Sequence, residues 1–186
     1  MELTKKQLTA ALAELERELE VKQVFAALRV IGGAAIALKY DATRVTADVD
    51  SIFDNYELVR DAVEATAARL GLPQDWVNSQ IRDLGLPFDA DESPDQIVIG
   101  PHLTLEIASA EFLLFTKVIS SRQADQDFDD AVILARHLGA TSAQEIEGLV
   151  KKFGPIDGPV ELFIEDIADE PVSYTHLTLP TNREVE

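Results

Sequence analysis

The sequence predicts an α+β fold, with helices and strands alternating over the first 108 residues and helices alone after them. The spacing of apolar residues indicates this class, because it changes between the steps of three to four that are typical of a helix with one buried face and the alternation that is typical of a strand. Turn residues, Gly71 with Pro73 and Gly100 with Pro101, stand where the spacing changes. The 186 residues, 46% of them hydrophobic, are enough for one domain with a sizeable core.

The first half of the chain begins with a helix predicted from Thr4 to Leu28, where apolar residues recur at steps of three to five. Thr4 and Gln7 form a capping box at its start. A short buried strand at 30–33 then ends in two glycines, and a helix is expected over 34–39. Residues 44–53 alternate polar with small or apolar side chains, which predicts a strand with one solvated face.

The rest of the chain predicts a helix, a hairpin and a helical C-terminal half. The expected elements are a helix at 57–70 that Gly71 ends, a short segment around Trp76, two strands within 97–107, and helices at 109–117, 127–138 and 142–152. Ser142 and Glu145 form a second capping box. Trp76 is expected to be a packing anchor, because tryptophan is largely buried in folded proteins.

Three regions are expected from these elements. Residues 1–108 are expected to form a sheet-and-helix core, and residues 109–170 a helical region packed on it. Residues 171–186 break the acidic, alanine-rich character of the chain and resemble the translated adapters that contaminate sequencing reads. We therefore expect them to be a non-native tail and exclude them from the fold.

The chain is strongly acidic, with 34 acidic and 16 basic residues and a net charge of −18. Such a charge repels phosphate backbones, so extensive DNA binding is not expected. Cysteine is absent, which excludes disulfides and thiolate metal sites. No apolar run approaches the ~18 residues of a membrane span, and the first residues do not form an apolar signal core. These features predict a cytoplasmic protein without membrane contact.

Asp48 and Asp50 are the strongest chemical feature, because side chains two apart on a strand leave from the same face. Two such carboxylates favour a shared divalent cation, and Mg²⁺ is the natural candidate because it takes oxygen ligands and keeps positions for water and phosphate. A solvated strand edge is the alternative. Gly32 and Gly33 precede the acids at a strand-to-helix junction, where backbone N–H groups can approach an anion, although a tight turn explains a glycine pair equally well. The two features together are more specific than either one.

With this combination the sequence resembles the nucleotidyltransferase superfamily of DNA polymerase beta. Residues 31–35 followed by 44–50 are similar to the bacterial branch that includes AbiEii-type toxin–antitoxin enzymes. Residues 71–78 are similar to a further segment of those relatives, and Leu113 to Lys117 with Arg122 and Asp127 to Asp130 resembles their C-terminal motifs. The resemblance implies the small mixed sheet of the nucleotidyltransferase fold, followed by a helical half.

The resemblance also implies an activity, the Mg²⁺-dependent transfer of a nucleoside monophosphate from a nucleoside triphosphate to a macromolecular hydroxyl. Asp48 and Asp50 would hold the metal. Glu106 would supply the third carboxylate, as a further ligand or as a general base, since it faces away from the apolar residues of its strand. The residues expected to bind the nucleotide are Gly32, Gly33, Arg44, Thr46 and Lys117.

Several alternatives follow. Ala34 stands where many members have a serine, and Glu106 is equally explained as a solvent-facing residue, so an inactive nucleotide- or partner-binding module of the same fold is the alternative function. The acceptor is expected to be tRNA or a partner protein, and the partner a cognate antitoxin or toxin. A tRNA acceptor would need a local basic patch, for which the candidates are Lys22, Arg29, Lys39 and Arg44.

The C-terminal helical motif predicts ion pairs. Asp127 and Asp130 are three apart on a helix and so lie on one face. They are expected to pair with Arg122 or Lys117 and to hold the C-terminal helices onto the site.

Overall fold

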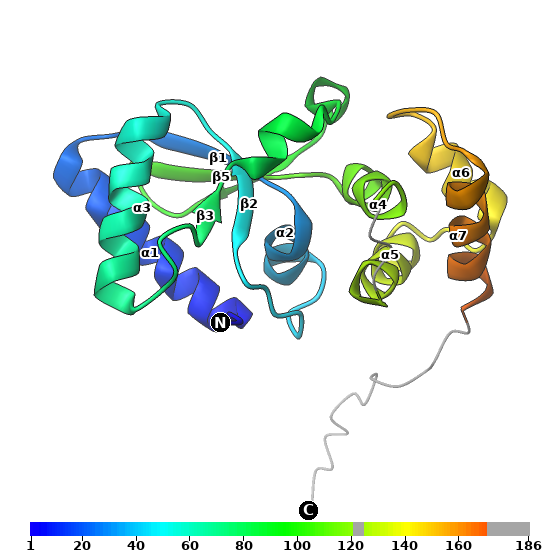
Figure 1. The fold of residues 1–186 in the computed structure, drawn as a ribbon, viewed down its shortest axis with the longest axis horizontal. Coiled ribbons are helices and arrows are strands. Elements are labelled where there is room, and N and C mark those ends of the chain that lie inside the picture. The colour runs from blue at the N-terminus through cyan, green and yellow to red at the C-terminus, as the bar shows by residue number, and fades with distance from the viewer. Residues whose placement is uncertain (121–124, 171–186) are drawn as a thin grey trace, which may run out of the picture.

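The computed structural model describes residues 1–120 and 125–170, which form an α+β fold with a helical C-terminal half, as the sequence predicts (Figure 1). Its helices are α1 (Lys5–Lys22), α2 (Gly32–Lys39), α3 (Tyr56–Leu70), α4 (Ala110–Val118), α5 (Asp125–His137), α6 (Ala143–Val150) and α7 (Gly158–Asp169), with two 3₁₀ helices, η1 (Gln80–Leu84) and η2 (Phe88–Ala90). Its strands are β1 (Ala26–Val30), β2 (Val49–Ile52), β3 (Val77–Asn78), β4 (Asp95–Val98) and β5 (Leu103–Ile107). Arg122 and the tail from 171 to 186 lie outside the described residues.

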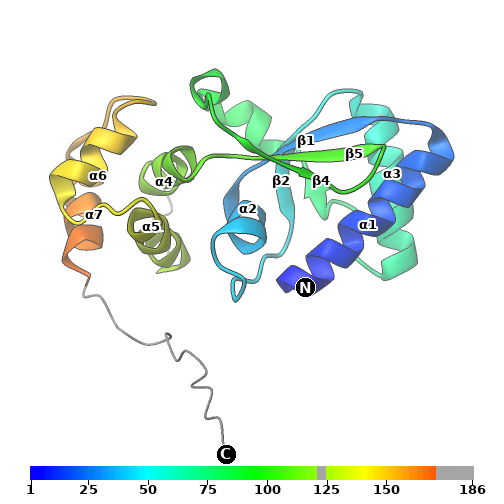
Figure 2. The same ribbon diagram turned by 180° about the vertical axis from the view of Figure 1, so that it is seen from behind.

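The strands form one mixed sheet in the order β3-β2-β1-β5-β4. The central strand β1 pairs antiparallel with β2 and parallel with β5. Helices α1, α2 and α3 lie on one side of the sheet, and the segment that contains η1 and η2 lies on the other (Figure 1, Figure 2). Burial alternates along β5, as predicted, because one face of the sheet packs on the helices.

Two helix starts are fixed by residues close in sequence, and both predictions are confirmed. The Thr4 side chain accepts the Gln7 backbone N–H while the Gln7 side chain accepts that of Thr4. Ser142 and Glu145 make the same reciprocal pair at α6. Gly71 ends α3 as expected, with a left-handed φ of 68° that costs glycine little.

The boundary between the first helix and the first strand is the main correction. The predicted helix to Leu28 ends at Lys22, and β1 begins at Ala26. Gln23 adopts a left-handed φ of 54°, so the chain turns out of the helix although apolar residues continue. Phe25, predicted on the buried stripe, is 67% exposed. The predicted strand at 44–53 is likewise shorter, since only β2 is regular.

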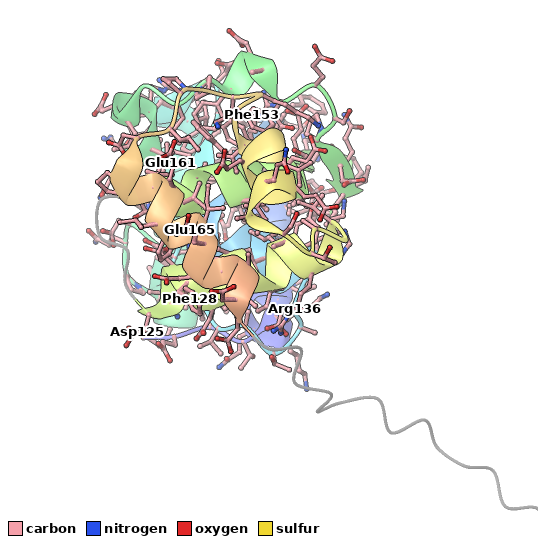
Figure 3. All side chains as sticks on the ribbon, turned by 90° about the vertical axis from the view of Figure 1, so that its right-hand side faces the viewer. Asp125, Phe128, Arg136, Phe153, Glu161 and Glu165 are labelled. Atoms are coloured by element: carbon pink, nitrogen blue, oxygen red, sulfur yellow. The ribbon has the colours of Figure 1, made fainter. Side chains whose placement is uncertain are left out.

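The C-terminal helices are packed beside α2. Helices α4 and α5 lie between α2 and the pair formed by α6 and α7 (Figure 1, Figure 2). Glu161 and Glu165 lie along the outward side of α7 (Figure 3). No helix within the described ranges combines the length and apolar character that crossing a membrane requires.

Trp76 anchors the start of β3 against α3. Its side chain is fully buried, and its indole N–H donates to the Val63 carbonyl of α3 at 3.2 Å. The predicted packing role is confirmed. This anchor positions β3, which pairs in parallel with β2 and therefore lies beside the aspartate strand.

Candidate active site

A cavity of about 420 Å³ lies where β1 ends, α2 begins and β2 starts, with α4 and α5 on its far side. Every predicted site residue except Glu106 lines it, namely Gly32, Gly33, Arg44, Thr46, Asp48, Asp50 and Lys117. Glu2, Gln80, Gln126 and Asp127 also line the cavity, and the sequence did not predict them as site residues. The structure thus gathers the predicted residues from three separate segments, around 32–33, 44–50 and 117, while their chemical roles stay predictions.

Gly32 and Gly33 allow the cavity walls to approach each other. Gly32 begins α2 with a φ of +66°, and a β-carbon there would lie 3.2 Å from Asp50 Oδ2. A β-carbon on Gly33 would lie 2.9 Å from Thr46 Oγ1 and 3.1 Å from Arg44 Nη2. No side chain caps the start of α2 by a hydrogen bond. Because Gly32 and Gly33 line the cavity, the uncapped start of this helix lies at its wall, an arrangement that suits an anion.

Strand pairing and the Thr46 hydroxyl help to hold the aspartates in place. The Asp50 carbonyl accepts the Ile31 N–H at 3.0 Å, which ties the middle of β2 to the end of β1. Thr46 Oγ1 donates to the Asp48 carbonyl at 3.0 Å. The Thr46 hydroxyl is thus engaged with the aspartate segment, and it lies against Gly33. Thr46 is itself held by two backbone hydrogen bonds with Leu3, of 2.7 and 3.0 Å.

The basic side of the cavity is tied to α5. Arg44 donates through Nε and Nη2 to the two carboxylate oxygens of Asp130, at 2.7 and 3.1 Å. Lys117 Nζ lies 2.7 Å from both Asp127 Oδ1 and Asp130 Oδ2. Asp130 is fully buried. The expected pairing of Lys117 with these acids is confirmed, and Asp130 joins the loop before β2 to α4 and α5.

The electrostatics of the cavity favour a cation. Burial disfavours the charge of Arg44, but its hydrogen bonds to Asp130 and the charges of Asp130, Asp127 and Glu2 together hold the pKa of its guanidinium above the ordinary value. Four carboxylates line the cavity against two basic groups, those of Arg44 and Lys117. An anionic ligand would therefore need a bound cation to offset this excess. Among the described residues, no group of three or more acidic, histidine or cysteine side chains is arranged to hold a metal alone.

Glu106 lies outside the cavity, contrary to its expected place beside the aspartates. Its strand β5 is separated from β2 by β1, and the register sets it opposite Arg29 of β1 and Gln96 of β4. Arg29 is in turn opposite Ile52, not Asp50. Alternation along the strand gives the face of Glu106 correctly, but the order of the strands removes it from the site.

Comparison with known proteins adds a family. A family model described as a nucleotidyltransferase of unknown function (DUF6036) matches residues 6–138, more than half of the chain. The match spans α1 to α5 and includes all the cavity residues except Glu2. Neither the search of curated proteins nor that of solved structures finds a match. The chain therefore belongs to this family of nucleotidyltransferases whose function is unknown.

Proposed function

We propose that this protein is a Mg²⁺-dependent nucleotidyltransferase that moves a nucleoside monophosphate from a nucleoside triphosphate to a hydroxyl of a partner macromolecule. The observation that carries the proposal is the shared cavity. It sets Asp48 and Asp50 across from the uncapped start of α2, with Gly32 close against Asp50. A cation on one wall and helix N–H groups on the other are the two means by which proteins hold triphosphates.

The donor set of the cavity fits Mg²⁺. Mg²⁺ is usually bound through one or two carboxylates, with the remaining positions taken by water and substrate phosphates. Asp48 and Asp50 supply these two carboxylates, and the acidic excess of the cavity wall gives a triphosphate little affinity without a cation. When bound, the metal would stabilise the charge that develops on the departing pyrophosphate.

The remaining residues of the cavity bind and orient the substrate. The N–H groups at the start of α2 would donate to phosphate oxygens, and the absence of a β-carbon at Gly33 keeps that approach open. Lys117 and Arg44 would attract the phosphates over a short range. Asp127 and Asp130 hold these two basic side chains in place through ion pairs. Glu106 is given no role as a base, because it does not line the cavity.

A protein hydroxyl is the acceptor that we favour over tRNA. Three of the four basic residues that could have formed an RNA-binding patch are paired with carboxylates, Arg29 with Asp91, Lys39 with Asp95 and Arg44 with Asp130. With a net charge of −18, these pairs weaken the candidate patch as a binding surface for a phosphate backbone. By resemblance to the AbiEii-type enzymes, we further propose that the partner is the cognate member of a toxin–antitoxin pair.

A second candidate is a nucleotide-binding module of the same fold without turnover. It is favoured by one observation, that only two of the three expected carboxylates line the cavity. Such a module would bind a triphosphate with Mg²⁺ and leave it intact.

One labelling experiment tests the proposal. The purified chain is incubated with a cell lysate, Mg²⁺ and each of the four ribonucleoside triphosphates, labelled in turn on the α- and the γ-phosphate. A nucleotidyltransferase transfers the α-label and releases the γ-label with pyrophosphate. We expect α-label on a protein band, lost with a chelator and in an Asp48→Asn, Asp50→Asn double variant. Transfer of the γ-label alone, or equal α-labelling by the double variant, would contradict the proposal.

Gly32→Ala is predicted to weaken triphosphate binding in addition to lowering stability. The left-handed backbone of an L-residue costs about 1–2 kcal/mol, and the new β-carbon would also press on Asp50 Oδ2. Gly71→Ala is a matched control, because Gly71 has a φ of +68° and no neighbouring atom within 4 Å. Urea unfolding should show a similar loss for both variants. Calorimetry with Mg²⁺ and the preferred triphosphate should show weaker binding for Gly32→Ala alone; equal binding by both would remove the steric argument.

A further inference from the structure

We infer that Asn78 is a positioning residue, which fixes the carboxylate of Asp48 for the cation. The inference rests on the proposed function, in which Asp48 is a metal ligand. Asn78 ends the two-residue strand β3 and stands opposite Asp50 in the parallel pairing with β2. Its side-chain Nδ2 donates to Asp48 Oδ2 at 3.2 Å. One residue of β3 is thus set against both aspartates, against Asp50 by register and against Asp48 by a hydrogen bond.

The orientation of the Asn78 amide is fixed by a second contact. Its Oδ1 accepts the backbone N–H of Gln80 at 3.1 Å, at the first residue of η1. Because the oxygen has this donor, the NH₂ group must point to Asp48 rather than away from it. The backbone of Asn78 is engaged as well, since its carbonyl accepts the Ser51 hydroxyl at 3.4 Å. The NH₂ group that donates to Asp48 is therefore fixed in two ways, by the contact of the amide oxygen and by the contact of the backbone carbonyl.

A neutral donor at this place has a definite consequence for metal binding. It occupies Oδ2 of Asp48 by a hydrogen bond and adds no charge beside the two carboxylates. The carboxylate plane of Asp48 is then set before a cation arrives, so less rotamer freedom is lost on binding. Partners of this kind orient metal-binding side chains, and their loss typically weakens metal affinity about 10- to 100-fold.

Mn²⁺ binding to the full chain tests the inference without reference to the acceptor or the base. The loss of the free-ion electron paramagnetic resonance signal measures Mn²⁺ affinity in the wild type, in Asn78→Ala and in Asn78→Leu, which keeps the branched shape. Both variants are expected to bind Mn²⁺ about 10-fold or more weakly. Gln96→Ala is the control, since Gln96 is an exposed amide opposite Glu106 in the same sheet and away from the cavity. Thermal melts should show all three variants folded.

A second measurement separates positioning from general damage. In the transfer reaction, Asn78→Ala should require about 10-fold more Mg²⁺ for half-maximal rate, and saturating Mg²⁺ should restore most of the rate. A folded Asn78→Ala protein with the Mn²⁺ affinity of the wild type, or a rate that Mg²⁺ does not restore, would overturn the inference and leave the proposed function intact. A wild-type chain that binds no Mn²⁺ would instead overturn the proposed function itself.

Discussion

Replacing Asp130 with alanine is expected to lower the free energy of unfolding by about 3–5 kcal/mol, the range found when one partner of a buried ion pair is removed. Asp130 is fully buried and is the acceptor for both Arg44 and Lys117. The side chains of these two cations are only 12% and 11% exposed, so water compensates only in part for the lost carboxylate. Asp127 still pairs with Lys117, which leaves Arg44 as the group that loses most.

Urea unfolding at pH 7 measures this effect, and the neighbouring acid supplies the control. Asp129 lies on the same helix and is exposed, so Asp129→Ala should change the free energy of unfolding by no more than about 0.5 kcal/mol. Asp130→Asn keeps one acceptor oxygen and should fall between the two. A loss below 1 kcal/mol in Asp130→Ala would show that the contacts among the loop before β2, α4 and α5 do not depend on this carboxylate.

The features that could be predicted from sequence are those fixed by residues close together in the chain. The capping boxes at Thr4 and Ser142 act over three residues, and the stop at Gly71 depends on one. The hairpin of β4 and β5 is likewise local. The pairing of Lys117 with Asp127 joins two helices, and it was predicted as one of two alternatives, Arg122 being the other, from the spacing that sets Asp127 and Asp130 on one helical face.

The boundary of α1 shows where local reasoning fails. The apolar spacing continues past Lys22, and nothing in the sequence marks Gln23 as the residue that turns the chain, because only glycine makes a left-handed backbone inexpensive. Phe25 was expected inside for the same reason and is exposed. The end of this helix is set by the pairing of β1 with β2 and β5, which lie far along the chain.

The residues of the site also differ in whether local sequence predicts their position. Gly32, Gly33, Asp48 and Asp50 belong to one short stretch, so the sequence could place them together. Glu2 and Asn78 reach the aspartate segment only through the Leu3–Thr46 bridge and the parallel pairing of β3 with β2, which no spacing rule predicts. The position of Glu106 depended on strand order, and alternation gives the face of a side chain but not its neighbouring strand.

Asp50→Asn is expected to lower the rate of nucleotidyl transfer about 100-fold or more. The change keeps the shape of the side chain and removes the charge that would hold the proposed Mg²⁺. A metal supplies several kcal/mol of stabilisation in the transition state, and each 1.4 kcal/mol corresponds to a factor of ten in rate. The variant should remain folded, because no resolved ion pair involves Asp50 among the described residues and its backbone carbonyl still accepts the Ile31 N–H.

Glu106→Gln is the matched control, since it makes the same change of charge two strands away from β2. With the acceptor band identified by α-labelling, initial rates for the two variants and the wild type are compared at saturating Mg²⁺. We expect Glu106→Gln to stay within about twofold of the wild type, because this half-buried residue does not line the cavity. An equal loss in both variants would mean that a carboxylate outside the cavity takes part in transfer. Strand order would then have excluded Glu106 from the site wrongly. A loss in Asp50→Asn alone would show that catalysis depends on the acids beside Gly32.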